Sequence, residues 1–546
     1  MNKIKQITGE VESVEGVKLL DVDPGKATNR TVVTLVGNPD AVIEAAFLMI
    51  KKAAEILDMS KHSGAHPRMG ATDVCPLVPI SGITMDEVVE YAHKLGKRVG
   101  DELGIPGYFY ENAATSEERR NLAYCRTGEY EGLEKLSDPK WKPDFGPAEF
   151  NDRVKTTGAT AISARDFLVA YNVNLNTTSA RRANAIAFDI REAGRVKRKG
   201  DPITGEIVND KDGNPVRIPG SLKAVKGMGW YIEEYGIAQI SFNLTNISIT
   251  PVHIAFDEAC KRAEERGLRV TGSELVGLIP LQAMLDAGDH FLKKQKCSLG
   301  ISVKEKIKIA VKSLGLDELT PFNPKEKIIE FMLEHDKTKK LIDMNLRSFA
   351  DETASESPAP GGGSIAAYIG SLGVSLGTMV ANLSSHKRGW DERWEEYSDW
   401  AVKGQQYKDE LLQLVDEDTN AFNKILESFR LPKATDDEKA ARNKAIQYAT
   451  KHAMEVPFKV MEIAYGSMEV MKTMAETGLE ASVSDAGVGA LCARSAVMGA
   501  FLNVKINAGG MDDKQFVDDI LTKGKEIQDK ANEMEEEILE IVNKKI

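Results

Sequence analysis

A histidine in an irregular segment is the first residue whose surroundings suggest chemistry. His66 lies in KHSGAHPRMGATDVCP, where Gly64, Pro67 and Gly70 disfavour regular helix or strand. Loops that a rigid scaffold holds often carry reactive groups. An imidazole that titrates near neutral pH can take a proton from an attacking amine and return it to a leaving nitrogen. We therefore consider His66 a candidate general acid and base; the alternative is a solvated loop histidine.

A carboxylate on the apolar face of a predicted helix is the second candidate. Residues 411–429 place apolar side chains at spacings of three and four, which define an inner helix face: Leu411, Val415, Phe422, Ile425 and Phe429. Asp418 falls on this face, whereas Asp416 points elsewhere and should stay ionised. Loss of hydration raises the pKa of a carboxyl group, so Asp418 could act as a general acid near neutral pH. The alternative is a structural hydrogen bond to a neighbouring helix.

A glycine-rich turn precedes another predicted helix. Pro358 and Pro360 break the chain in PAPGGGS, and the helix then opens with Gly361, Gly362, Gly363 and Ser364. Helix amino termini offer unpaired N–H groups to anions or carbonyl groups. Alternatively, the glycines serve only close packing. Further polar residues in apolar surroundings either line the same pocket or make structural hydrogen bonds: Ser484, Asp485, Asn503 and Asn507.

Two basic segments supply positive charge in an acidic chain. The net charge of -12 argues against general nucleic-acid binding, so an anionic ligand needs a local basic patch. The segments GRVKRKG and SLKAVKGMGWY could form a track for a polyanionic tail, or they are ordinary solvated loops. Their basic residues are Arg195, Lys197, Arg198, Lys199, Lys223 and Lys226.

The elements that must position these residues alternate between strand and helix over the first 330 residues. Strand patterns occur in VKLLDVD, RTVVTLVG, DVCPLVPI and GYFYEN, with helices predicted at 40–59 and 84–103. A similar run follows, with strands in ARDFLVAYNVNL, GWYIEEYGIAQISFNL and LRVTGSELVGLIP and helices at 181–192, 251–266 and in LQAMLDAGDHFLKK. We expect two similar α/β subdomains, each a ferredoxin-like α+β sandwich. In VNDKDGNPVRIPG, Gly213 falls too early for a calcium loop, and the Asp-Gly pair predicts a hairpin turn.

The last third predicts an all-α domain. The uncharged stretch 357–386 is long enough for a membrane span, but its many Gly and Ser residues favour a buried helix, so we expect no membrane insertion. The final segment places six apolar residues on one helix face: Phe516, Ile520, Ile527, Met534, Ile538 and Ile541. A chain of 546 residues is too long to fold around one hydrophobic core, so we expect several domains. The expected parts are 1–177, 178–330, a linker at 331–341, and 342–546.

The cysteines and the amino terminus bear on the compartment. The five cysteines lie far apart, without a CxxC motif, which argues against a zinc site and favours reduced thiols. The first residues contain no apolar run of signal-peptide length. We expect a cytoplasmic protein without a bound metal.

Two of these segments resemble a known family. LLDVDPGKATNRTVVTLVG followed by HSGAHPRMGATDVCPLVPI resembles the amino-terminal half of the transferase in the formiminotransferase-cyclodeaminase family. In that family the histidine of the HPRMGA motif is the catalytic acid and base, and it matches His66. Asp21 and Asp23 match acidic residues near the family's active site. The resemblance implies that Asp23 positions or assists the imidazole, whereas we expect Asp21 to cap a turn.

The segment DFGPAEFNDRVKTTGATA resembles the folate-binding loop of the same family. Its charged residues Asp152, Arg153 and Lys155 depart from the family pattern, so an ordinary loop between subdomains is the alternative. The segment KGMGWY is also family-like, which would place the basic residues near the glutamate tail of folate. Residues to which the match assigns substrate binding are Gly146, Pro147, Phe150, Thr157 and Gly158.

The carboxyl-terminal third is similar to the cyclodeaminase half of the family. The resemblance lies in SPAPGGGSIAAYIGSLGVSLGTMV, VDEDTNAF, RLPK and FLNVKIN, and the catalytic aspartate of the family matches Asp418. The resemblance implies two joined reactions of histidine degradation. The formimino group of N-formimino-L-glutamate moves to N5 of tetrahydrofolate, releasing L-glutamate. N10 then attacks that carbon, ammonia leaves, and 5,10-methenyltetrahydrofolate forms. Polyglutamylated tetrahydrofolate is the implied co-substrate, and a homo-oligomer built from dimers is the implied assembly.

The amino terminus departs from the family pattern. Family members begin with an extra apolar strand and a loop resembling VPNFSEG, and we find no match to these before Val17. A missing strand would expose a sheet edge and could remove part of the transferase pocket. Two alternatives stay open: an enzyme with only the carboxyl-terminal cyclodeaminase or a related cyclohydrolase activity, and a non-catalytic folate-binding scaffold.

Overall fold

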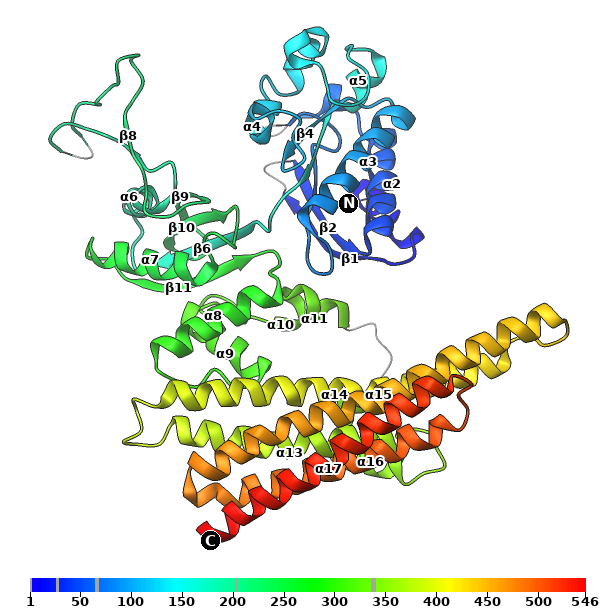
Figure 1. Cartoon of the computed structure of the whole chain (residues 1–546). Coiled ribbons are helices and arrows are strands. Elements are labelled where there is room, and N and C mark those ends of the chain that lie inside the picture. The colour runs from blue at the N-terminus through cyan, green and yellow to red at the C-terminus, as the bar shows by residue number, and fades with distance from the viewer. Residues whose placement is uncertain (1, 26–28, 64–67, 202–203, 335–339) are drawn as a thin grey trace. The chain divides into compact units, whose positions relative to one another are not determined.

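The computed structural model describes residues 2–25, 29–63, 68–201, 204–334 and 340–546. Contacts divide the chain into two compact units, shown with their elements in Figure 1: Met1–Ala283 with Leu314–Leu333, and Met284–Ser313 with Glu334–Ile546. The first unit contains the sheets and the second is helical, as the sequence predicts. Residues 284–313 group with the helical unit, although the predicted boundary lies at residue 330.

Two small sheets form the amino-terminal part of the first unit. Strands β1 and β2 pair antiparallel, and β5 lies between β3 and β4 in a parallel sheet. Helices α2 and α3 pack on each other, and Thr84 and Glu87 form the capping box that starts α3. The elements are α1 (Asn2–Thr8), η1 (Val11–Ser13), β1 (Val17–Gly25), β2 (Arg30–Gly37), α2 (Pro39–Ile56), η2 (Met59–Lys61), β3 (Val74–Leu77), α3 (Met85–Leu103), β4 (Gly107–Glu111), η3 (Glu118–Arg120), α4 (Leu122–Cys125), η4 (Tyr130–Ser137), η5 (Pro139–Trp141), α5 (Asp152–Thr157) and β5 (Thr160–Ala164).

A four-stranded antiparallel sheet of order β11-β6-β10-β9 follows in the chain. Helix α6 packs on β9 and β10, α7 packs on β6 and β11, and the two helices touch, so both cover one face of the sheet. The predicted Asp-Gly turn is confirmed, because Asp210 N–H donates to Asn214 O over 2.8 Å and Gly213 has φ +83°. The elements are β6 (Val169–Leu175), α6 (Ala180–Ile190), β7 (Arg195–Val196), β8 (Arg217–Ile218), β9 (Val225–Ile232), β10 (Ile237–Leu244), α7 (Val252–Glu264), β11 (Val270–Val276), α8 (Leu281–Lys294), α9 (Val303–Leu314), α10 (Pro324–Lys327) and α11 (Ile329–Glu334).

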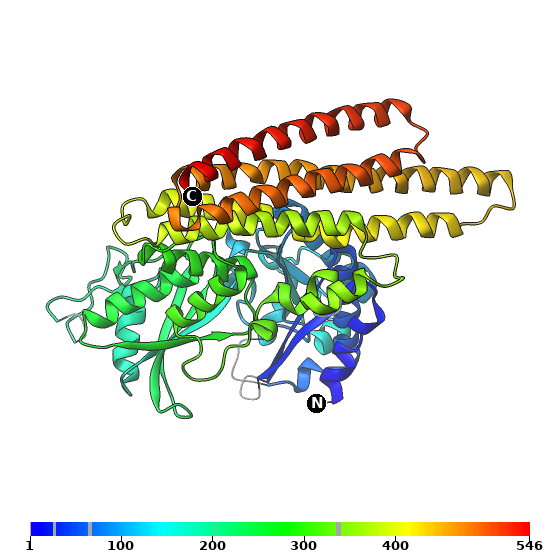
Figure 2. The same ribbon diagram turned by 90° about the horizontal axis from the view of Figure 1, so that it is seen from below.

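Five long helices form the bundle of the second unit and run side by side in both views (Figures 1 and 2). Helix α13 packs against α14, α15 and α16, and its small residues allow close contact: a Cβ on Gly373 would lie 2.8 Å from Gly489 O. The apolar face of α17 packs on the core as predicted. The elements are η6 (Leu341–Asp343), α12 (Leu346–Thr353), α13 (Gly362–Ser385), α14 (Trp394–Arg430), α15 (Asp436–Thr477), η7 (Glu480–Ser482), α16 (Val483–Ala508) and α17 (Lys514–Lys545).

Two segments of this unit are long and apolar enough to cross a membrane by length and composition. They are α13 and Glu480–Ala508. In α13, 61% of the most apolar window is buried inside the protein. The predicted buried helix is therefore confirmed.

One part of the predicted inner face of α14 is wrong. Leu411 and Val415 are fully buried, but Phe422 is 40% exposed and Phe429 is 52% exposed. Helix α13 packs against α14 and begins at Gly362. The next residue, Gly363, lies against Asp418 of α14. Phe422 and Phe429 lie on the part of α14 that follows Asp418, beyond the start of α13.

Candidate functional site

The carboxylate of Asp418 lies against the amino-terminal turn of α13. Ser364, in that turn, is fully buried, and its hydroxyl donates to Asp418 Oδ2 over 3.1 Å. Helix amino termini stabilise anions through unpaired N–H groups and the helix dipole. The carboxylate of α14 thus lies in the kind of anion site that the glycine-rich turn suggests.

Gly363 makes this contact possible. A Cβ at this position would lie 2.5 Å from Asp418 Cγ and 2.7 Å from Oδ2, and closer still to Oδ1. Real Cβ atoms essentially never approach so closely. The carboxylate therefore occupies the space that any side chain at residue 363 would need.

Asn503 of α16 lies beside the same turn. A Cβ on Gly362 would lie 3.2 Å from Asn503 Nδ2, which donates to Gly499 O over 2.9 Å. A Cβ on the N-cap residue Gly361 would meet nothing closer than 3.9 Å, so Gly361 borders open space. The structure thus brings Asp418, Gly362, Gly363, Ser364 and Asn503 together from three helices.

Burial raises the pKa of Asp418 above its ordinary value, while the hydroxyl and the backbone N–H of Ser364 act in the opposite direction. The predicted direction is confirmed. A raised pKa increases the fraction of Asp418 that carries a proton near neutrality, as a general acid requires.

Asp416, two residues earlier, points elsewhere, as predicted. Its Oδ1 accepts from the backbone N–H of Leu341 over 2.7 Å, so it holds the chain that leads into the bundle. Burial raises the pKa of Asp416 as well, and the Leu341 hydrogen bond lowers it. Desolvation alone therefore does not distinguish the two aspartates; the contact with the α13 turn does.

The sequence reasoning missed Thr419. Its Oγ1 lies 3.3 Å from Ser364 Oγ, which also lies 2.9 Å from Val415 O. Its only signal in the sequence is its position next to Asp418 in DEDTN. Identifying it requires the rotation of α14 relative to α13.

Ser484 and Asp485 do not join this site. They lie at the start of α16, about 27 Å along the helix axis from Asn503 at 1.5 Å per residue. Asn507 donates to Ala453 O over 2.8 Å, the structural role that was its alternative.

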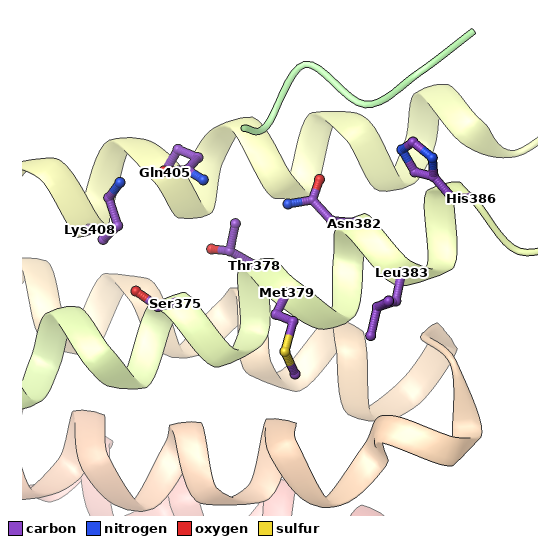
Figure 3. A pocket seen from close by; sticks show the side chains of 8 residues that line it. All are labelled: Ser375, Thr378, Met379, Asn382, Leu383, His386, Gln405 and Lys408. Carbon is purple, nitrogen blue, oxygen red and sulfur yellow. The ribbon is translucent and has the colours of Figure 1, made fainter. Parts of the chain in front are cut away.

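A separate cavity of about 430 Å³ lies farther along α13 and α14 (Figure 3). Ser375, its lining residue nearest to Ser364 in the chain, is about 16 Å farther along the α13 axis. None of the residues predicted for a site lines it. Its residues are Ser375, Thr378, Met379, Asn382, Leu383, His386, Gln405 and Lys408.

His66 lies outside the described residues, but the chain on its carboxyl side is firmly held. Arg68 donates to both carboxylate oxygens of Glu131, over 2.7 and 3.1 Å, and to His62 O. Asp73 accepts from Met69 N–H over 2.9 Å and forms an ion pair with Arg126. These contacts fix the end of the HPRMGA motif.

The predicted folate-binding loop is joined to this motif. Gly70 and Gly158 form an antiparallel bridge, with Ala71 N–H donating to Thr157 O over 2.8 Å and Ala159 N–H donating to Met69 O over 3.0 Å. Gly158 has φ +69°, and a Cβ there would collide with Met69 O. Two segments that the sequence separates by about 90 residues thus meet.

The other residues of the loop pack around that bridge. Thr157 is 2% exposed and donates to Arg153 O over 3.0 Å, so its hydroxyl is used internally. Phe150 packs edge-on near the Tyr130 ring, with centroids 6.4 Å apart. Pro147 is half-buried, and Gly146 has φ +75°, where an added Cβ would collide with Ile105 O.

The acidic candidates in β1 both lie within the paired strands β1 and β2. Asp21 pairs with Thr34 and Asp23 with Val32 within the β1–β2 ladder. The expectation that Asp21 caps a turn is therefore wrong. Asp23 is exposed; its relation to His66 falls outside the described residues.

The basic segments are partly neutralised. Arg195 pairs with Asp189 and donates to Ala185 O over 2.8 Å, and Lys223 lies 3.6 Å from Glu192. Lys197 and Lys226 are exposed. Both side chains, like that of Lys223, are accessible to an anion in solution. No cluster of His, Cys, Asp and Glu that could hold a metal occurs among the described residues.

An α/β unit, a helical bundle and a half-buried acid at a helix amino terminus define a two-part chain with the features of an acid-base enzyme. Family models match the chain in three segments: "Formiminotransferase domain, N-terminal subdomain" over 1–165, "Formiminotransferase domain" over 170–334, and "Formiminotransferase-cyclodeaminase" over 345–526. The chain belongs to the formiminotransferase-cyclodeaminase family.

Curated relatives extend over nearly the whole chain. It is 43% identical to the formimidoyltransferase-cyclodeaminase of Gallus gallus, covering 94% of this chain and 91% of that protein, and 40% identical to that of Dictyostelium discoideum, covering 99% and 96%. It is also 40% identical to the glutamate formimidoyltransferase of Streptococcus pyogenes serotype M1, covering 53% of this chain and 88% of the relative. The amino-terminal family model matches from residue 1, whereas we expected no match before Val17.

Proposed function

We propose that this chain is a bifunctional folate enzyme of histidine degradation. It transfers the formimino group from N-formimino-L-glutamate to N5 of tetrahydrofolate, releasing L-glutamate. It then cyclises 5-formiminotetrahydrofolate to 5,10-methenyltetrahydrofolate and releases ammonia. The family membership supports this activity, and tetrahydrofolate is the co-substrate it implies.

The observation that carries the second reaction is the half-buried Asp418 held at the start of α13. Attack of N10 on the formimino carbon forms a C–N bond and leaves that carbon bonded to three nitrogens. Asp418 gives its proton to the amino nitrogen, the C–N bond to that nitrogen breaks, and ammonia departs. The carboxylate then takes the proton that N10 loses, which restores the acid.

In the first reaction His66 is the acid and base that protonates the departing glutamate nitrogen. The bridge between Gly70 and Gly158 supports a folate site next to the HPRMGA motif, with Asp23 assisting. The exposed Lys197 and Lys226 would meet the glutamate tail of a polyglutamylated folate. These assignments rest on the motif match.

Several broader statements belong to the same proposal. The transferase region consists of ferredoxin-like subdomains at 1–177 and 178–330, joined through 331–341 to a cyclodeaminase domain at 342–546. The protein is a cytoplasmic homo-oligomer built from dimers and binds no metal. The five cysteines lie far apart in the sequence, without a CxxC motif, which supports the reducing compartment.

The test follows the two chemical steps separately. Consumption of N-formimino-L-glutamate reports the transfer, and ammonia release from supplied 5-formiminotetrahydrofolate reports the cyclisation. His66→Ala should abolish the first and leave the second, and Asp418→Ala should do the reverse. A single variant that abolishes both steps in folded protein, or an Asp418→Ala variant that releases ammonia at the wild-type rate, would contradict the division of labour.

A further inference from the structure

The hydroxyl of Ser364 has more acceptors than it has protons. Its Oγ lies 2.9 Å from Val415 O and 3.1 Å from Asp418 Oδ2, both within hydrogen-bond distance. A serine hydroxyl carries one proton and cannot donate to both at once. Ser364 is fully buried, so among the described residues these groups and Thr419 are its hydrogen-bonding neighbours.

The charge on Asp418 determines whether the Ser364 hydroxyl donates to Asp418 Oδ2 or to Val415 O. Hydrogen bonds to an ionised acceptor are roughly twice as strong as those between neutral groups. The hydroxyl therefore turns to Oδ2 when Asp418 is ionised, and Thr419 Oγ1, 3.3 Å away, can then donate to the free lone pair of Ser364. When Asp418 is neutral, Val415 O is the shorter contact and takes the proton.

We propose that Ser364 is a positioning residue that turns its hydroxyl from Val415 O to Asp418 Oδ2 as Asp418 gives up its proton. During the step the O–H bond of Asp418 breaks, an N–H bond forms on the departing nitrogen, and the electron pair stays on the carboxylate. The hydroxyl rotation supplies a donor where that charge develops, while the heavy atoms stay in place. This inference rests on the proposed cyclodeaminase function and deepens it.

The charged groups on the helices around Asp418 contact other residues, so the role of hydrogen-bond donor to Asp418 falls to Ser364. Helix α13 contains no Asp, Glu, Lys or Arg. On α14, Glu417 pairs with His452 of α15 over 2.9 Å, and Asp416 holds Leu341. On α16, Lys505 lies over the Phe501 ring. Burial and Ser364 are the influences on the pKa of Asp418.

The test compares pH profiles of ammonia release from 5-formiminotetrahydrofolate. Ser364→Ala removes the donor and makes Asp418 a weaker acid, so kcat should fall about tenfold and the alkaline limb should move up by about one pH unit. Ser364→Thr keeps the hydroxyl and should restore the wild-type limb. Ser364→Cys, which nearly matches the volume but donates weakly, should lie between them.

The control is Ser467→Ala, because Ser467 is equally buried but donates within its own helix α15, to Ala464 O. It should leave the pH profile unchanged. An alkaline limb at the wild-type position in both Ser364→Ala and Ser364→Cys would overturn the inference and leave Ser364 with a packing role. Ammonia release by Asp418→Ala in the same assay would instead refute the proposed function, so the two failures are distinguishable.

Discussion

Replacing Gly363 with alanine tests whether the carboxylate position in the structure is the working position. The added Cβ would lie 2.5 Å from Asp418 Cγ, whereas ordinary contact begins at 3.4 Å. The carboxylate must therefore retreat by at least about 0.9 Å, the difference of these two distances, because Oδ1 lies closer still. That retreat would stretch the 3.1 Å hydrogen bond from Ser364 beyond useful length.

The expected loss is in the chemical step. A misplacement of about 1 Å in a catalytic group costs on the order of 100-fold in rate. Stability should change less, because alanine favours a helix by up to about 1 kcal/mol over glycine while overpacking costs about 1–3 kcal/mol. We expect kcat for ammonia release to fall about 100-fold and the free energy of unfolding to fall by no more than about 2 kcal/mol.

The assay measures ammonia release from 5-formiminotetrahydrofolate together with urea unfolding. Gly487→Ala is the matched control, since it adds a methyl group inside α16 where the nearest atoms lie 3.4 Å away. The control should keep its activity. A folded Gly363→Ala protein with near wild-type kcat would show that Asp418 works from another position, and the proposed geometry would be wrong.

Four further predictions test other parts of the structure. Phe422→Ala should raise KM for the folate several-fold with little change in kcat, because the half-exposed ring one helical turn from Asp418 offers an apolar surface to an aromatic substrate; an unchanged KM would exclude that contact. Burial raises the pKa of Asp418, so the folded state holds this proton more tightly than the unfolded state, and wild-type stability should fall relative to Asp418→Asn as pH rises from about 4 through the raised value, measured by urea unfolding. Arg126→Met should destabilise the first unit by about 3 kcal/mol, because it leaves the carboxylate of Asp73, which is only 13% exposed, without its cation; a loss below about 1 kcal/mol would show that water replaces the arginine. Thr84→Ala removes the cap of α3 and should cost about 1 kcal/mol in the same unfolding experiment.

Local patterns in the sequence were sufficient for much of the fold. The period of α17 identified the residues that pack on the bundle core, and the Asp-Gly pair identified the turn near residue 213. Periodicity also placed Asp418 on the side of α14 that faces another helix. These features depend on neighbours within a few residues, which the sequence displays directly.

Features set by the ends and rotations of packed helices could not be predicted in this way. Phe422 and Phe429 continue the apolar stripe of α14, but nothing in that stripe reveals that α13 begins at Gly362 and leaves them half-exposed. Ser484 and Asp485 share a helix with Asn503 yet lie at its opposite end. The contact of Thr419 with Ser364 depends on the rotation of one helix against another.

The backbone bridge at Gly70 and Gly158 has a mechanical consequence. Two backbone hydrogen bonds, from Ala71 to Thr157 and from Ala159 to Met69, join the two segments, so a shift of one is transmitted to the other. A displacement of the loop at Thr157 and Ala159 would therefore move Met69 and Ala71 with it.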